Sequence, residues 1–366
     1  VGHSEANVGN VDLITRSTAV PDANPEVRVA QERGIPVLSR ADVLTAISRV
    51  RNTVAVAGTH GKTTTSSMLA VILREAGLDP SFIIGGEVNE IGSGAAWTPD
   101  GSWFVVEADE SDGTFLSLDA AAAIITSVEP DHLAHYGSPD ALTDAFASFV
   151  DNVDGPSVIC LDDEGAAALA DRPGAITYGL DAGADWRITE YRSERSSASF
   201  DLVRGDGPPV HVGLATPGLH NVRNATAAVI MAHHLGADVD VAATALARFG
   251  GVARRFQFRG ESNGVSYVDD YAHLPSEVSA ALEAAAAGGW ERIVCVFQPH
   301  RYTRTKDLWR AFGSSFVDAD VVVITDIYAA GEAPLPGVSG KLIADAVGAA
   351  EPDTDLAYIA HRTELH

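Results

Sequence analysis

Residues 58–64 have the composition and order of a phosphate-binding loop between a predicted strand and a predicted helix. Glycines let backbone N–H groups wrap around an anion, and the N-terminus of the following helix adds its dipole. A lysine in this position reaches phosphate oxygens, and the hydroxyl after it can ligate Mg²⁺. The spacing is shorter than G-x-x-x-x-G-K-[ST], because Val56 stands where the first glycine would be. The alternative is a glycine turn with a solvated lysine, but the flanking elements favour a nucleotide site made by Gly58, Thr59, His60, Gly61, Lys62, Thr63 and Thr64.

Two acidic runs follow, each at the end of a predicted strand. The first is Glu107-Ala-Asp-Glu-Ser-Asp112 and the second is Glu129-Pro-Asp-His132. Ligand sites in open α/β sheets lie at the carboxyl ends of the strands, so both runs are expected near the phosphate loop. Clustered carboxylates repel one another unless a cation lies among them, and Mg²⁺ on the phosphates of ATP is the natural one. Either run alone could instead be a solvated acidic turn, and an imidazole is a less usual ligand for Mg²⁺.

Alternating strands and helices are predicted to position these residues. The strand Thr53–Ala57 leads into a helix over Thr63–Ala76, in which Leu69, Ile72, Leu73 and Ala76 share one apolar face. Further strands are predicted at Trp103–Glu107, Ala121–Thr126 and Ser157–Leu161, and helices at Asp140–Val150 and Asn221–Leu235. The irregular segment Ala175–Pro217 is interpreted as a β-rich insertion.

A second alternation begins near Gly264. Its predicted strands are Val265–Asp269, Arg292–Gln298 and Val321–Thr325, and its predicted helices are Pro275–Ala286 and Asp307–Phe316. Strands separated by helices indicate a parallel sheet with right-handed crossovers. The chain is therefore predicted to hold two α/β units that meet within residues 243–260. The first 48 residues, with one strand at Val11–Thr15 and two helical patches, are too short for a domain and are interpreted as the remainder of one.

Composition narrows the classes of partner. The 366 residues are 46% hydrophobic and 20% charged, with a net charge of −25, which argues against binding a nucleic-acid phosphate backbone. Apolar runs such as Ala121–Ile125 are far shorter than the ~20 residues of a membrane span, and Val1–Asn10 lacks the pattern of a signal peptide. Cys160 and Cys295 lie in apolar runs, as expected of buried thiols in a reducing compartment. We therefore expect a cytoplasmic protein without a nucleic-acid or membrane partner.

Motifs along essentially the whole chain resemble those of the Mur ligase family. Beyond the loop and the two acidic runs, they are His220-Asn-Val-Arg-Asn224, Arg254-Arg-Phe256, Asp269-Asp-Tyr-Ala-His273, Pro299-His-Arg-Tyr-Thr-Arg-Thr305 and Tyr328-Ala-Ala-Gly-Glu332. The resemblance implies an α/β fold with three-domain architecture. Residues 1–49 would be the remainder of a truncated UDP-sugar-binding domain, 50–247 a central ATP-binding domain with a P-loop ATPase-like parallel sheet, and 248–366 an incomplete Rossmann-like domain.

The resemblance also implies a role for each matching residue. Lys62, Arg255 and His132 would be catalytic, and Thr63, Glu107 and His132 would ligate Mg²⁺. Beside the loop, the residues implied to bind ATP are Asn221, Asn224, Arg255 and Asp270. The residues implied to hold substrate carboxylates, a task suited to guanidinium groups, are His273, His300, Arg301 and Arg304. Leu274 stands where the family usually has a second histidine, so no role is assigned to it.

The implied reaction is ATP-dependent joining of L-alanine to the lactyl carboxylate of UDP-N-acetylmuramate, through an acyl phosphate, in peptidoglycan precursor synthesis. A monomer or homodimer is expected, and replacement of Lys62 by alanine is expected to abolish turnover with the fold intact. A sibling ligase that attaches a whole peptide to the same sugar is one alternative, and a non-ligase P-loop ATPase or a non-catalytic relative is another. The run ending at Tyr136-Gly137 and residues 299–305 favour the alanine reaction.

Overall fold

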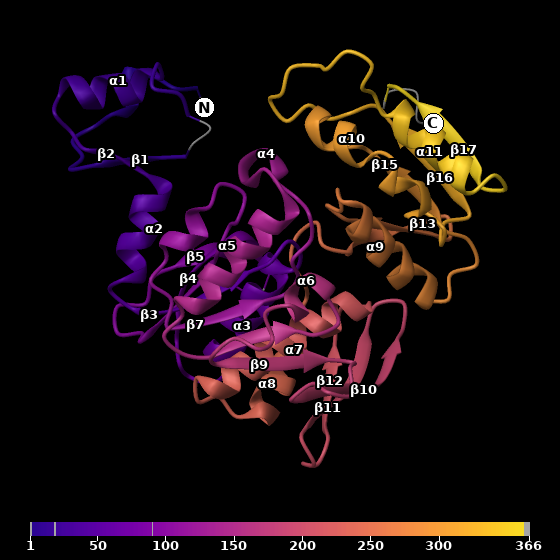
Figure 1. The fold of residues 1–366 in the computed structure, drawn as a ribbon, viewed down its shortest axis with the longest axis horizontal. Helices are drawn as coiled ribbons and strands as arrows, with labels where there is room; N and C mark the ends of the chain where they lie inside the picture. The colour runs from indigo at the N-terminus through magenta and orange to yellow at the C-terminus, as the bar shows by residue number, and fades with distance from the viewer. Residues whose placement is uncertain (1, 18–19, 90, 362–366) are drawn as a thin grey trace.

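The structure is a computed structural model that describes residues 2–17, 20–89 and 91–361. Figure 1 shows three parts in chain order, from indigo through magenta to yellow. The elements of the first part are the 3₁₀ helix η1 (Glu5–Asn7), β1 (Ile14–Arg16), α1 (Pro25–Glu32), β2 (Val37–Ser39) and α2 (Arg40–Ser48). β1 and β2 pair in parallel. β1 is shorter than the predicted strand Val11–Thr15 and begins three residues further along the chain.

The central part is built on a ten-stranded sheet in the order β12-β11-β10-β9-β8-β7-β3-β6-β4-β5. Its strands are β3 (Asn52–Ala57), β4 (Ser81–Val88), β5 (Ser93–Ala96), β6 (Trp103–Glu107), β7 (Ala122–Ile125), β8 (Ser157–Cys160), β9 (Ala175–Gly179), β10 (Trp186–Ser193), β11 (Ala198–Arg204) and β12 (Val210–Leu214). The strands from β10 to β4 run parallel, whereas β5, β11 and β12 pair antiparallel at the two edges. The segment 175–217 is rich in strands, as predicted, but its interpretation as an insertion is wrong, because β9–β12 extend this same sheet.

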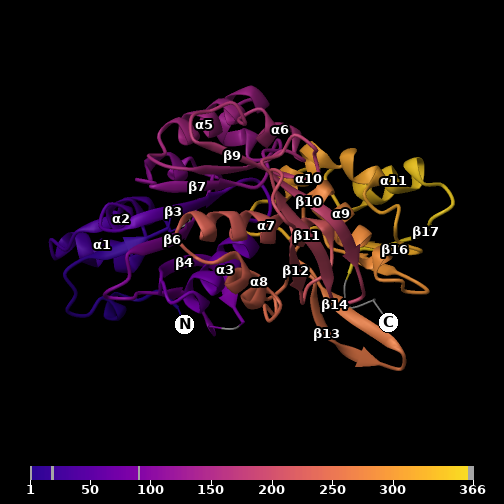
Figure 2. The ribbon, with the colours of Figure 1, turned by 90° about the horizontal axis from the view of Figure 1, so that it is seen from below.

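Helices cover both faces of the central sheet (Figure 2). On one face pack α3 (Lys62–Glu75), α7 (Leu219–His234) and α8 (Val239–Leu246), and on the other lies α5 (Pro139–Asp151), preceded by α4 (Leu133–Tyr136). The short elements η2 (Thr114–Ser117) and α6 (Glu164–Ala167) complete this part. Residues 53–57 of β3 are all buried, as expected of a parallel strand covered on both faces. β3 lies between β6 and β7, so the chain turns in opposite directions on its two sides, and ligands bind at such switch points.

The last part contains two small sheets. A hairpin is formed by β13 (Gln257–Ser262) and β14 (Val265–Asp269), and a parallel sheet by β15 (Val294–Phe297), β16 (Val321–Thr325) and β17 (Asp355–Ile359). Its helices are α9 (Pro275–Ala287), α10 (Tyr302–Leu308), η3 (Ala311–Ser314) and α11 (Lys341–Ala350). The prediction that residues 265–269 join a parallel sheet is wrong: Asn263 and Gly264 both have positive φ and turn the chain into an antiparallel hairpin. The predicted bounds 307–316 are also wrong: α10 begins at Tyr302 and ends at Leu308, and the 3₁₀ helix η3 follows within the predicted range.

The central part and the last part each have a hydrophobic core of their own. The first runs from Leu44 to Val252 and fills the central part, and the second runs from Val278 to Val347 in the last part. The last part thus packs around a core of its own, and its contact with the central part is a surface contact between two units. Within the described ranges of the chain, no helix has both the length and the apolar character that a membrane span requires.

Candidate active site

The phosphate loop follows β3 and enters α3 through two positions that only glycine fits. Gly58 and Gly61 have φ of 132° and 76°. A Cβ on Gly58 would lie 2.1 Å from Thr126 Oγ1, and one on Gly61 would lie 2.3 Å from Asn224 Oδ1. A side chain at either position would collide with its neighbour and strain the backbone. The loop therefore has the close backbone packing expected of an anion-binding turn.

The turn after β7 holds the loop in place. The N–H of Thr59 donates to the Ser127 carbonyl, and the N–H of His60 donates to the Ser127 hydroxyl, both at 2.9 Å. The Thr59 hydroxyl accepts from the N–H of Glu129 at 2.8 Å. These contacts join the loop to the second acidic run, as the placement of both at strand ends predicts.

Lys62 is the first residue of α3, and its ammonium group turns back over the loop. Nζ donates to the carbonyl oxygens of Gly58 (2.6 Å) and Thr59 (3.3 Å). It also lies 3.0 and 2.8 Å from the two carboxylate oxygens of Glu110, a residue that is only 2% exposed. Burial raises the pKa of Glu110, whereas the charge of Lys62 lowers it. Sequence reasoning included Glu110 in the first acidic run but assigned it no role.

Thr63 and Glu107 together fit a magnesium ion. Thr63 Oγ1 donates to both carboxylate oxygens of Glu107, at 3.1 and 3.0 Å, and the N–H of Gly85 donates to Oε2 at 2.7 Å. A Cβ on Gly85 would lie 2.8 Å from that oxygen, so the backbone of β4 closes one side of the carboxylate. A hydroxyl and a carboxylate are the oxygen donors that Mg²⁺ prefers.

His132 is paired with Asp131. Its Nε2 lies 3.3 Å from Asp131 Oδ2, and it starts α4 with a left-handed backbone, φ 54°. Burial lowers its pKa, although Asp131 acts in the opposite direction, and a neutral imidazole is the form that binds metals. Over residues 2–17, 20–89 and 91–361, no group of three or more His, Cys, Asp or Glu side chains could hold a metal. The metal and catalytic roles of His132 stay predictions.

A cavity of about 520 Å³ lies between the phosphate loop, α7 and α9. Asn221 and Asn224, in the first turns of α7, line it and are 5% and 7% exposed. Asn221 Nδ2 donates to the Pro217 carbonyl at 2.7 Å, which fixes the orientation of the amide. Gly61 and Thr64 line the same cavity. The structure thus brings these predicted nucleotide-binding residues to one place.

Arg255 and Asp270 reach this cavity from the last part of the chain. Asp270 accepts hydrogen bonds from the N–H groups of Phe256 (2.8 Å) and Ala272 (2.6 Å), which lower its pKa, but burial raises it more strongly. Arg255 Nη1 lies 3.9 Å from Glu277 Oε1. Residues that are far apart in sequence therefore surround one cavity from two separately cored units.

Three of the four predicted substrate-binding residues, His273, His300 and Arg304, form a second cluster. The rings of His273 and His300 lie 5.7 Å apart, and Arg304 Nη1 lies 3.1 Å from His300 Nδ1. Arg304 Nη2 lies 3.4 Å from Asp131 Oδ2, so α10 also contacts the second acidic run. Burial and the charge of Arg304 lower the pKa of His300 to about 4. The side chain of Arg301 is exposed, and this residue has a left-handed backbone with φ 71°.

Ser276 and Glu277 of α9 line the cavity and were missed by sequence reasoning. The sequence signal was partial, because Glu277 is the third residue of the predicted helix, as in a capping box, but Leu274 stands where that motif has serine or threonine. Glu277 Oε2 accepts from the N–H groups of His273 (2.8 Å) and Leu274 (3.1 Å). Leu274 itself is 4% exposed and apolar, so its position is a packing position.

Comparison with known proteins agrees with this geometry. Residues 1–52 match the model described as Mur ligase family, catalytic domain, 56–232 the Mur ligase middle domain, and 254–366 the Mur ligase, glutamate ligase domain. The UDP-N-acetylmuramate–L-alanine ligase of Mesorhizobium japonicum is 45% identical over 350 residues, 93% of this chain and 75% of that protein. The enzyme of the same name from Pelotomaculum thermopropionicum is 47% identical over 351 residues, 94% and 76% of the two chains.

Solved structures show the same likeness. The crystal structure of a UDP-N-acetylmuramate–alanine ligase from Thermotoga maritima matches with a TM-score of 0.83 at 29% identity, covering 100% of this chain and 80% of that one. A murein peptide ligase from Psychrobacter arcticus shares the fold, with a TM-score of 0.68 at 24% identity over 100% and 81% of the two chains.

A parallel sheet with a phosphate loop at its switch point and an acidic run beside it defines a nucleotide-dependent enzyme. The chain belongs to the Mur ligase family, and it is an ATP-dependent amide ligase. The family resemblance and the α/β architecture expected from the motifs are both confirmed. The two relatives described above, at 45% and 47% identity, are both named UDP-N-acetylmuramate–L-alanine ligase.

Proposed function

We propose that the protein joins L-alanine to the lactyl carboxylate of UDP-N-acetylmuramate, cleaving ATP to ADP and phosphate, in cytoplasmic synthesis of peptidoglycan precursors. The observation that carries the proposal is the 45% identity over 93% of the chain to a relative named for this reaction. The intact phosphate loop and the Thr63–Glu107 pair support it. Both substrates and the nucleotide are small molecules, and we extend the proposal to a monomer or homodimer that acts without nucleic acid or membrane.

The site can carry out two successive displacements. An oxygen of the substrate carboxylate attacks the γ-phosphorus, the bond to the ADP oxygen breaks, and an acyl phosphate forms. The amine of L-alanine then attacks the acyl carbon, the bond to phosphate breaks, and the departing phosphate takes up the proton that the amine nitrogen loses. Because two anions approach in the first step, positive charge must face the transferring group, and we assign this charge to Lys62 of the phosphate loop and to Arg255 of the cavity lining.

Thr63 and Glu107 would hold Mg²⁺, which neutralises charge on the phosphate oxygens when bound. The chain orients this pair itself, because the N–H of Gly85 fixes one oxygen of Glu107 and the start of α3 fixes Thr63. Since Lys62 and Arg255 come from different units, the reaction requires these units to be closed against each other. Closure also excludes water from the acyl phosphate.

A second candidate is a ligase that attaches a whole peptide to the same sugar nucleotide, because a murein peptide ligase shares the fold. The alanine reaction is favoured by the higher TM-score of the alanine ligase, 0.83 against 0.68. The deciding experiment incubates the protein with ATP, Mg²⁺, UDP-N-acetylmuramate and an equimolar mixture of alanine, glycine, serine and a tripeptide amine. We expect mass spectrometry to show the alanyl product first, with ADP and phosphate. A dominant peptide product would assign the second candidate, and AMP with pyrophosphate would refute the acyl-phosphate route.

A further inference from the structure

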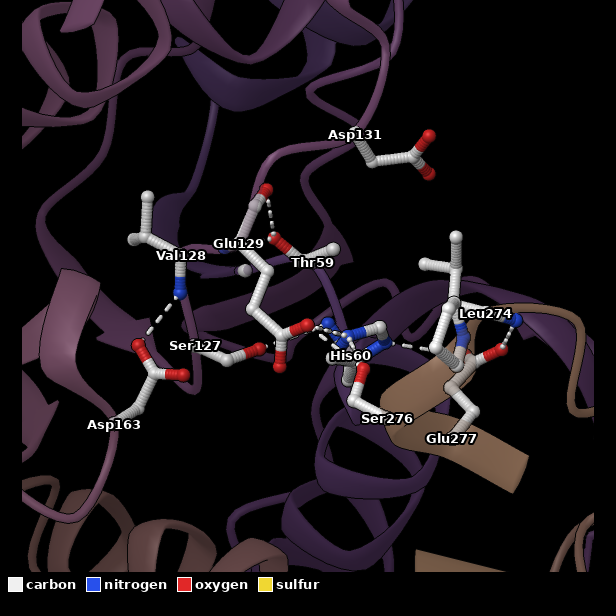
Figure 3. A network of polar contacts seen from close by, with 12 residues as sticks. Thr59, His60, Ser127, Val128, Glu129, Asp131, Asp163, Leu274, Ser276 and Glu277 are labelled. Carbon is white, nitrogen blue, oxygen red and sulfur yellow. Dashed lines mark hydrogen bonds and ion pairs between the residues drawn. The ribbon is translucent and has the colours of Figure 1, made fainter. Parts of the chain in front are cut away.

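His60 lies where the phosphate loop meets the N-terminus of α9, between two carboxylates from different units (Figure 3). Its Nδ1 lies 3.2 Å from Glu277 Oε1, and its Nε2 lies 3.3 Å from Glu129 Oε2. Glu129 follows β7 in the central unit, whereas Glu277 belongs to the last unit. The imidazole is therefore a bridge between the units and also a part of the phosphate loop.

Ser276 completes the contact. Its hydroxyl donates to Glu129 Oε2 at 2.7 Å and lies 3.1 Å from His60 Nε2 (Figure 3). Two residues of the central unit and two of α9 thus form one closed set of polar contacts. We call His60, Glu129, Ser276 and Glu277 the latch.

The protonation state of His60 suits this position. Only an imidazolium can donate from both ring nitrogens, and both face carboxylate oxygens here. Burial alone would lower the pKa of His60, but the hydrogen bonds to Glu129 and Glu277 raise it to about 9. Burial acts to raise the pKa of Glu277, but its bond to His60 and nearby positive charge lower it overall. Arg255, at 3.9 Å, and His273, at 3.4 Å, also face Glu277. The charge of Glu277 further acts to raise the pKa of Glu129, His220 and Asp270, which lie near it.

We propose that His60 is a positioning residue for domain closure: through Glu277 it holds the start of α9 on the phosphate loop and so brings Arg255 to face the nucleotide. Arg255 and α9 belong to the same unit, and Arg255 Nη1 approaches the same oxygen of Glu277 that His60 contacts. Lys62 cannot bridge the two units in this way, because its ammonium group is paired with Glu110 within the central unit. The expected effect of the latch on turnover rests on the ligase function proposed above. Its effect on the closure of the two units does not.

Replacement of Glu277 by glutamine tests the latch selectively. Glutamine retains an oxygen that can cap the first turn of α9, so the helix start is preserved while the charge facing His60 is removed. The matched control is Glu291→Gln, which removes an exposed charge from the same unit. The two measurements are small-angle scattering of the protein without nucleotide and steady-state kinetics at saturating substrates.

We expect Glu277→Gln to increase the radius of gyration and to lower kcat by about tenfold, since a charge-assisted bond becomes a neutral one. The control should match the wild type in both. In the wild type the contribution of the imidazolium to closure is complete below pH 6.5, its ordinary pKa, and is lost as the pH rises through about 9. Glu277→Gln should move this alkaline opening to lower pH, an effect that a merely structural role for Glu277 would not produce.

An unchanged radius of gyration together with kcat within twofold of the control would overturn the proposal. If Glu277→Gln does not fold, Ser276→Ala takes its place, with a smaller loss of compactness and turnover expected and no change counting against the latch. If the wild type performs no ligation at all, the proposed function fails, and the scattering comparison still decides whether the latch closes the two units.

Discussion

Replacement of Lys62 by alanine changes two properties at once. The first is turnover, because the phosphate loop loses the charge that faces the transferring phosphoryl group; we expect a loss of at least roughly 10²–10³ in kcat. The second is stability, because the partner of Lys62 is Glu110, which is 2% exposed. The expectation of an intact fold, drawn from the sequence, ignored this partner. Removing one member of a buried pair leaves an uncompensated charge.

The destabilisation can be worked out from proton uptake. Without Lys62, burial and the charge of Asp109 raise the pKa of Glu110 against a single backbone hydrogen bond, so we expect its carboxyl to take up a proton on folding. Neutralising a glutamate of ordinary pKa about 4.3 at pH 7 costs about 1.4 kcal/mol per pH unit, or roughly 3.7 kcal/mol in all, and this is the upper bound on the loss relative to the wild type because the pKa of Glu110 is already raised when Lys62 is present. The folded variant then binds more protons than its unfolded chain, so its stability rises as the pH falls. At pH 5 the cost shrinks to about 1 kcal/mol by the same arithmetic.

Denaturant titrations of wild type and Lys62→Ala at pH 5, 6 and 7 measure this difference. The double variant Lys62→Met with Glu110→Gln should recover most of the stability and none of the turnover. Lys341→Ala serves as the matched control, because its partner Asp345 is exposed and the pair contributes about 0.3–0.5 kcal/mol. A loss of stability in Lys62→Ala that is the same at pH 5 and pH 7 would refute the reasoning.

Two further predictions concern the metal and the substrate carboxylate. Glu107→Gln should raise the Mg²⁺ concentration for half-maximal activity by about tenfold or more, because one of two fixed oxygen donors loses its charge. Phosphate release measured across a Mg²⁺ titration tests this, and an unchanged Mg²⁺ requirement would exclude Glu107 as a ligand. Arg304→Lys should raise the KM for L-alanine by about tenfold, because an ammonium group cannot replace the guanidinium that contacts His300 and Asp131 together. A KM equal to that of wild type at an unchanged melting temperature would contradict this role.

Much of the local structure was predictable, because local signals specify it. The boundaries of β3, α3, β6 and α9 agree with the sequence predictions to within a residue or two. Each of these segments combines a continuous or periodic apolar pattern with a turn or capping residue at its end. Asn263-Gly264 was also a signal for the β13–β14 hairpin, because this dipeptide favours a tight turn between antiparallel strands. The alternation of strands and helices that follows led instead to the prediction of a parallel strand at 265–269.

The sequence by itself therefore determined the phosphate loop, the two acidic runs, the family and the α/β class, all of which depend on residues close together in the chain. Only the tertiary structure decided which side chains meet. His60 and Glu277 are 217 residues apart, and the partner of Lys62 is one of several nearby carboxylates. An apolar pattern shows that a residue is buried without showing against what, and the position of α9 depends on how two separately cored units rest on each other. The charges at their contact form the latch, whereas packing within the central unit decides the partner of Lys62, and no local signal contains either piece of information.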